Sequence, residues 1–204
     1  MAAQWPVFIN NVSSKMSSRS STGPDEFGKF IANEYYNAVK TSQTTYGNIH
    51  ISGNKAILEN GFKKAFNDLF KIEATADDFK DPSTKYMPAY NTMAKCIIDY
   101  WKSTTSLPFN STPPVPPCTI PVPGTYIPIS YGNQSKLGID LQKAWTSGKS
   151  AQSDSATNSA TQKVASEVSI ACASHLSELK FTYIGSMMVG VAVVPATGQV
   201  SSAF

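Results

Sequence analysis

LENGFKKAFNDLF at residues 58–70 and YNTMAKCIIDYW at residues 90–101 are the two stretches that decide the fold. In both, apolar residues recur every three or four positions, which is the spacing of one face of an α-helix. These positions are Leu58, Phe62, Ala65, Phe66, Leu69 and Phe70 in the first stretch, and Tyr90, Met93, Ala94, Ile97, Ile98 and Trp101 in the second. The pattern predicts two amphipathic helices that pack through large side chains.

A similar helix pair is expected on each side of this one. Before it, apolar residues at 8, 9, 12 and 16 predict a short helix, and Pro24 followed by two acids predicts the start of a longer one. After it, residues 137–145 predict a short helix and residues 154–179 a long one, with Asp154 as its N-cap. The long helix is rich in small residues, which suits the middle of a bundle or a subunit contact.

Each pair leads into a segment with strand character. Residues 46–51 alternate with period two, residues 119–131 are extended, and the segment from 181 to 194 predicts a hairpin that turns near Gly185 and Ser186. We therefore predict a mainly helical α+β fold with three helix-pair units, short peripheral β-strands and a Pro-rich extended arm.

The arm is the segment with the highest proline content. Prolines crowd into residues 108–123, and they remove backbone donors and favour polyproline-like geometry. We expect an arm or an edge element here and exclude a central strand. The predicted organisation is a helical lobe at 1–106, the arm at 107–136 and a helix pair with a β-hairpin at 137–204, or one compact domain overall.

The apolar residues of the arm and of the final strands need a surface on which to be buried, and we predict that other subunits supply it. The predicted assembly contacts are Pro113, Pro114, Pro116, Pro117, Ile120, Val122, Tyr126, Ile127, Tyr131, Met188, Val191 and Val193.

Composition favours assembly over chemistry. Only 15% of the residues are charged, and such a surface is cheap to desolvate against neighbours, although a free domain has the same character. A net charge of +3 without a basic stripe argues against a nucleic acid as the primary partner. The start of the chain lacks the pattern of a secretory signal, and the longest apolar run, 187–196, is too short to cross a bilayer, so no membrane is expected as a partner.

The residues that usually carry catalysis or bind metals are few and scattered. Cys96, Cys118 and Cys172 have neither disulfide nor metal-ligand spacing, so we expect no metal and no cofactor. Ser174 and His175 are adjacent and face different directions on a helix, which disfavours a catalytic dyad. The acids Glu73, Asp77, Asp78 and Asp81 lack the pattern of a calcium loop, and the acids Asp99, Asp140, Glu167 and Glu178 are spread over separate helices. We predict that the chain is not an enzyme.

Three longer blocks resemble a known group of proteins. These are WPVFINNVSSKMSSRS (5–20), YGNIHISGNKAILENGFKKAFNDLF (46–70) and CTIPVPGTYIPISYGNQSKLGIDLQKAW (118–145), the last followed by SGKSAQSDSATNSAT (147–161). They are similar to small virion structural proteins of T-even-type myoviruses that infect cyanobacteria. The resemblance implies a place in a contractile-tailed phage particle that is made in the bacterial cytoplasm. It carries no catalytic residue over to this chain.

The function expected from these observations is a tail component, at the baseplate or neck, that docks onto other virion proteins and onto copies of itself. Two alternatives remain open. One is a capsid decoration protein, which would differ by its higher copy number. The other is a module that binds or hydrolyses host glycans, which would need paired carboxylates that face one cleft.

Overall fold

A computed structural model describes most of the chain, and its helices match the predicted order. The described residues are 3–18, 22–40, 42–44, 47–48, 51–72, 83–106, 109–111, 122–147, 154–189 and 192–201. The helices are α1 (Trp5–Ser17), α2 (Pro24–Val39), α3 (Lys55–Lys71), α4 (Ser83–Lys102), α5 (Gln134–Thr146) and α6 (Asp154–Glu178). None of these helices combines the length and apolar character that crossing a bilayer requires. Asp154 is the first residue of α6 rather than its cap.

Local sequence explains where several helices begin. Pro24 opens α2 with Asp25 and Glu26 in the first turn, where the acids complement the helix dipole. Asparagines cap α3 and α5: the Asn54 side-chain oxygen accepts the Ala56 N–H at 3.1 Å, and the Asn133 oxygen accepts the Lys136 N–H at 3.0 Å.

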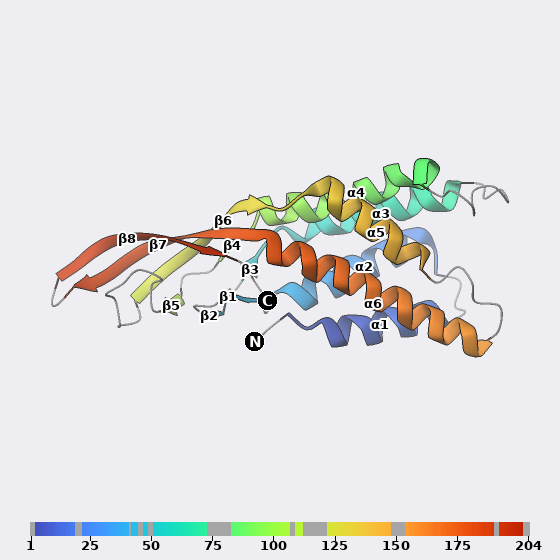
Figure 1. Cartoon of the computed structure of the whole chain (residues 1–204), viewed down its shortest axis with the longest axis horizontal. Coiled ribbons are helices and arrows are strands. Elements are labelled where there is room, and N and C mark those ends of the chain that lie inside the picture. The colour runs from blue at the N-terminus through green and yellow to red at the C-terminus, as the bar shows by residue number, and fades with distance from the viewer. Residues whose placement is uncertain are drawn as a thin grey trace.

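The six helices form a closed bundle. Each helix contacts the next one along the chain, and α6 returns to pack against α1 (Figure 1). The contact between α3 and α4 is close because Gly61 has no side chain: a Cβ there would lie 2.0 Å from Cys96 Cβ. Packing at that distance explains why a glycine stands inside a helix, where it costs about 1 kcal/mol relative to alanine.

One hydrophobic core runs through all six helices and reaches the first residues of the strand that follows α6. The core is therefore continuous between the ranges 1–106 and 137–204. Its centre is aromatic: Trp101 and Tyr35 are almost fully buried, and the Trp101 indole N–H donates to the Tyr35 hydroxyl at 2.9 Å. The predicted apolar stripes of α3 and α4 are confirmed as buried, except at Leu69, which is partly buried against the core, and at Phe70, which is 64% exposed.

The strands are β1 (Gln43–Thr44), β2 (Gly47–Asn48), β3 (Ile51–Ser52), β4 (Thr105–Ser106), β5 (Phe109–Ser111), β6 (Val122–Tyr131), β7 (Leu179–Val189) and β8 (Ala192–Ser201). The first four make two small antiparallel pairs, β1 with β2 and β3 with β4. The others make one antiparallel sheet in the order β5-β6-β7-β8. This sheet projects beyond one end of the bundle, and α6 leads into it without a loop (Figure 1).

The mainly helical α+β prediction is confirmed, with three helix pairs each followed by strands. Of the predicted strand at 46–51, residues 47–48 and 51 are described as strand, and His50 lies outside the described residues. The predicted turn near Gly185 and Ser186 is wrong. Both residues lie inside β7, which pairs with β8 as far as Val189 opposite Ala192.

The segment predicted as an arm or edge element forms strand β6, which β5 flanks only at residues 122–124. From Thr125 to Tyr131 the only described strand that pairs with β6 is β7, so this part keeps the predicted edge character. The prolines of β6 are accommodated at the two places where the ladder allows them. Pro123 precedes Gly124, where the described pairing with β7 begins, and Pro128 stands where the register shifts before Ser130. A proline at such an irregularity removes no regular ladder hydrogen bond.

Candidate functional site

The predicted assembly contacts that the structure describes all lie in the projecting sheet. Val122, Tyr126, Ile127 and Tyr131 belong to β6, and their ladder partners are, in the same order, Ser111, Tyr183, Thr182 and Leu179. Met188 in β7 pairs with Val193 in β8. The sheet thus brings together residues from the two predicted contact regions. Pro113, Pro114, Pro116, Pro117, Ile120 and Val191 lie outside the described residues.

Strand β8 forms one edge of this sheet. In the described part of the chain β7 is its only strand neighbour, so the outer backbone groups of β8 face away from the sheet. Its sequence, AVVPATGQVS, contains no charged residue. Natural edge strands commonly carry charged residues, which prevent unwanted pairing with other chains. The ten residues of β8 include no charged residue, so this edge is suited to pairing with another strand.

The base of the sheet also exposes apolar side chains. Ile127 and Ile129 of β6 are 36% and 45% exposed, whereas Pro128 between them is buried. The two isoleucines thus add exposed apolar surface at the base of the sheet.

The sheet is attached to the bundle through the start of β7. Leu179 and Phe181 are fully buried in the core, and the Phe181 ring meets the Trp101 ring edge-on at 6.2 Å between centroids. Because α6 continues directly into β7, the core fixes the direction in which the sheet projects.

A second attachment joins the turn between β6 and α5 to the end of α6. The ring nitrogen Nε2 of His175 lies 2.8 Å from the carbonyl oxygen of Tyr131. The next residue, Gly132, has φ of 72°, and a Cβ there would lie 2.8 Å from the His175 ring. Glycine is required at this position both by the left-handed backbone and by the histidine.

Charged residues reinforce this turn. The Glu178 carboxylate accepts the backbone N–H of Asn133 at 3.1 Å and pairs with the Lys136 ammonium at 3.0 Å. Lys136 also pairs with Asp140 at 3.1 Å and approaches Ser174 Oγ at 3.3 Å. Burial raises the pKa of Glu178, but its bonds to Lys136 and Asn133 outweigh burial and leave that pKa below its usual value.

Ser174 and His175 therefore have different hydrogen-bond partners: Ser174 contacts Lys136, and His175 contacts Tyr131. His175 is 2% exposed, and since a carbonyl oxygen can only accept, its Nε2 carries the proton and its Nδ1 does not. That Nδ1 is buried without a hydrogen-bond partner among the described residues. Burial lowers the pKa of His175, against the opposing effects of Tyr131 and Glu178.

This environment predicts acid sensitivity. The folded chain disfavours the protonated His175, so the unfolded chain binds more protons as the pH falls below about 6.5. Stability should be full above that pH and should decrease steadily as the pH falls toward the lowered pKa of His175. The measurement is the free energy of urea unfolding between pH 7.5 and pH 5. His175→Gln should lose most of this slope and His50→Gln should keep it; the same slope in both variants would contradict the assignment.

The cysteines are poor nucleophiles where the structure describes them. Cys96 and Cys172 are buried and unpaired. Burial raises the pKa of the Cys172 thiol to about 12 and that of Cys96 further, so both stay protonated and pack as small apolar groups. Cys118 and the acids Glu73, Asp77, Asp78 and Asp81 lie outside the described residues. Within the described ranges, His, Cys, Asp and Glu form no group of three that could hold a metal ion.

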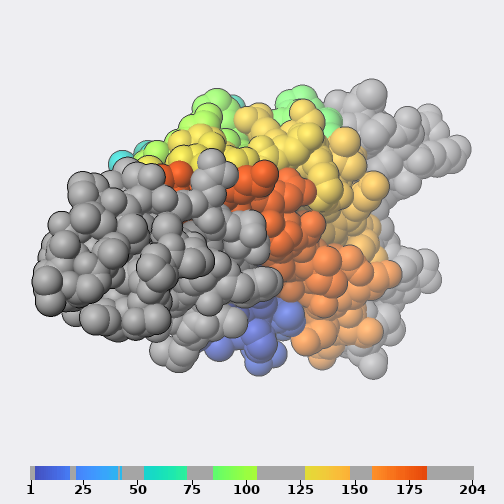
Figure 2. Space-filling model, turned by 60° about the vertical axis from the view of Figure 1, so that its left-hand side comes forward, coloured from blue at the N-terminus to red at the C-terminus, as the bar shows by residue number. Residues whose placement is uncertain are grey.

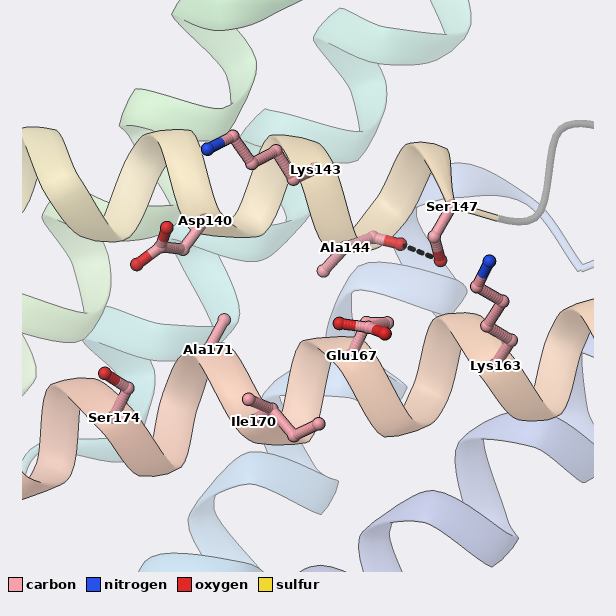
Figure 3. A pocket seen from close by; sticks show the side chains of 9 residues that line it. All are labelled: Asp140, Lys143, Ala144, Ser147, Lys163, Glu167, Ile170, Ala171 and Ser174. Carbon is pink, nitrogen blue, oxygen red and sulfur yellow. Dashed lines mark hydrogen bonds between the residues drawn. The ribbon is translucent and has the colours of Figure 1, made fainter.

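The described residues also form grooves that were not predicted from the sequence, and two of them contain residues considered above. The first, of about 420 Å³, lies between α5 and α6 and brings Asp140 and Glu167 to one surface, although their positions in the sequence suggested no convergence (Figure 3). Lys143 and Lys163 line the same groove. The second, of about 400 Å³, is aromatic, and the exposed Phe70 lines it together with Tyr90 and Trp145.

The sequence contained only part of the information needed to predict the first groove. The small residues of α6 indicated a close approach of another helix, but which face α5 covers depends on the antiparallel packing of the two helices. Comparisons with protein-family models, curated proteins and solved structures found no match to this chain.

Proposed function

We propose that this chain is a structural subunit of a contractile-tailed phage particle, a tail component at the baseplate or neck that attaches to neighbouring subunits through its projecting sheet. The observation that carries the proposal is the outer edge of β8, which is uncharged and has no strand neighbour among the described residues. Pairing along such an edge supplies directed backbone hydrogen bonds without any charged surface.

The rest of the molecule suits this role. The closed bundle with its aromatic centre gives a stiff body, and the buried start of β7 holds the sheet in a fixed direction relative to it. A preorganised docking strand loses less conformational entropy on binding than a flexible arm does. The exposed Ile127 and Ile129 add apolar surface to the same sheet, on β6, which β7 separates from that edge.

Two sequence features support a virion in particular. The resemblance to small structural proteins of T-even-type myoviruses extends over blocks that include α3, β6 and α5. The low proportion of charged residues fits a subunit that is surrounded by others.

The experiment that tests this function is a quantitative analysis of purified particles. We expect the chain to remain with the particles through density-gradient purification and to be present in about six or twelve copies, or a small multiple, as the rings of a tail require. Gel densitometry against the major tail and capsid proteins gives that number. Absence of the chain from mature particles would refute the structural role, and hundreds of copies would replace the tail assignment with capsid decoration.

A further inference from the structure

The second groove described above, the aromatic one, is built by side chains from three helices. They are Leu69 and Phe70 at the end of α3, Ile72 directly after it, Tyr86 and Tyr90 near the start of α4, and Trp145 near the end of α5. Figure 2 shows α4 and α5 side by side on the surface of the bundle. None of the described residues that line the groove is charged, so it suits an uncharged partner with apolar surface.

The core holds the wall of this groove in place. The Trp145 ring meets the Phe66 ring edge-on at 5.4 Å and the Phe27 ring at 6.2 Å, measured between centroids. Tyr90 is buried, and burial raises the pKa of its hydroxyl to about 12, so this wall stays uncharged. Phe70 is 64% exposed, so its ring is open to a partner. A fixed aromatic wall loses little conformational entropy when it binds.

Aromatic-lined grooves are the usual binding sites of proline-rich segments, and this chain contains such a segment. Residues 112–121, TPPVPPCTIP, include five prolines and no charged residue. The spacing Pro-x-x-Pro occurs at 113–116 and again at 114–117. Such a sequence favours the polyproline II helix, which forms before binding and therefore docks with little further loss of entropy. The chemistry of this Pro-rich segment thus matches that of the groove.

The Pro-rich segment cannot reach the groove of its own chain. Its flanking residues Ser111 and Val122 pair with each other in the sheet, so the segment leaves and returns at one place and extends from it by no more than about 20 Å. From Val122 the chain follows β6 and then α5 along the long axis of the molecule to Trp145 (Figure 1). At the usual rise per residue this path covers more than about 40 Å. The segment can therefore reach only the groove of another molecule.

We propose that the Pro-rich segment of one copy of this chain docks as a polyproline II helix in the aromatic groove of a second copy. Its prolines pack against Phe70 and Trp145. The contact joins the sheet of one copy to the opposite end of the bundle of the next, so it is heterologous. Repeated contacts of this kind build a ring or an open filament. The contact uses neither the outer edge of β8 nor any other virion protein.

Self-association of the purified full chain tests this contact. Sedimentation velocity from about 1 to about 100 µM should show species that grow beyond a dimer as the concentration rises. Phe70→Ala should weaken this association at least about tenfold, and Val7→Ala, at an exposed apolar residue of α1, should leave it unchanged. Thr197→Pro, which removes a backbone donor from β8, should also leave it unchanged. That variant separates failure of this contact from failure of the proposed docking through β8.

A mixture of two variants tests which surfaces meet. The segment variant has alanine in place of Pro113, Pro114, Pro116 and Pro117 and keeps an intact groove, whereas Phe70→Ala keeps an intact segment. Each variant alone should associate at least about tenfold more weakly than the unchanged chain. The mixture should form a one-to-one complex and no larger species, because it contains one intact segment for each intact groove. Thermal unfolding of both variants should match that of the unchanged chain.

A synthetic peptide identifies the occupant. A labelled peptide of residues 112–121 with Cys118→Ser should bind the segment variant saturably in fluorescence anisotropy, and the same peptide with alanine at the four prolines should not. A chain that stays monomeric up to about 100 µM would overturn the second copy as the occupant, even if the peptide binds. Association that Phe70→Ala leaves intact, or a mixture that forms no complex, would overturn the contact between the segment and the groove.

Discussion

Replacing Trp101 by alanine is expected to reduce the free energy of unfolding by about 3 to 5 kcal/mol. The side chain is fully buried at the centre of the bundle, where it contacts Tyr100 and Phe181, so its removal leaves a cavity between α4 and the start of β7. It also removes the N–H that donates to the buried Tyr35 hydroxyl. An unsatisfied buried hydroxyl costs about 1 to 3 kcal/mol, which places the expected effect at the upper end of that range.

Urea unfolding followed by circular dichroism gives this number. Phe70→Ala is the matched control, since Phe70 belongs to the same aromatic set but is exposed, and its replacement should change stability by no more than about 0.5 kcal/mol. Because Trp101 touches Phe181, the variant should also fail to enter particles at the growth temperature. Equal stability of the two variants would contradict the placement of the core.

The helices could be predicted from the sequence because their signals are local. The three- and four-residue spacing of apolar residues from Leu58 to Leu69 predicts which face of α3 is buried. Pro24 and the two acidic residues after it predict where α2 begins. Phe70 shows the limit of this reasoning. It continues the apolar spacing, but it lies at the end of α3, where its side chain is no longer covered by the core.

The parts that could not be predicted depend on contacts between distant residues. The sequence around Gly132 does not predict its contact with His175, which lies 43 residues later. Together these two residues shape the turn that attaches β6 to α5. The proline content of β6 predicted an edge element, but only the register shows that it pairs with β7 and that Pro128 stands at an irregularity of that ladder.

Loss of assembly without loss of folding is the second large effect, and Thr197→Pro is expected to produce it. Pro195 already lies in β8, opposite Ser186, and has no N–H, so a complete ladder with β7 requires its nitrogen to face the outer edge. Backbone groups alternate along a strand, so the N–H of Thr197 faces the same way. A proline at Thr197 therefore removes a donor from the outer edge and leaves the pairing with β7 intact.

Two variants separate the outer edge from the inner one. Thr197→Ala keeps the outward N–H and should behave as the unchanged chain. Ala196→Pro removes an N–H that points toward β7, so it should weaken the hairpin itself and lower the unfolding temperature. Thr197→Pro should unfold within a few degrees of Thr197→Ala.

The central claim is that the outer edge of β8 fastens this chain to its neighbours, and the most direct test is the amount of each variant in purified particles. Particles grown with only the variant chain are analysed by quantitative mass spectrometry, with the major tail protein as the internal standard. We predict normal amounts of Thr197→Ala and at least about a tenfold loss of Thr197→Pro, the equivalent of about 1.4 kcal/mol of docking free energy. Equal incorporation of a folded Thr197→Pro chain would contradict the claim.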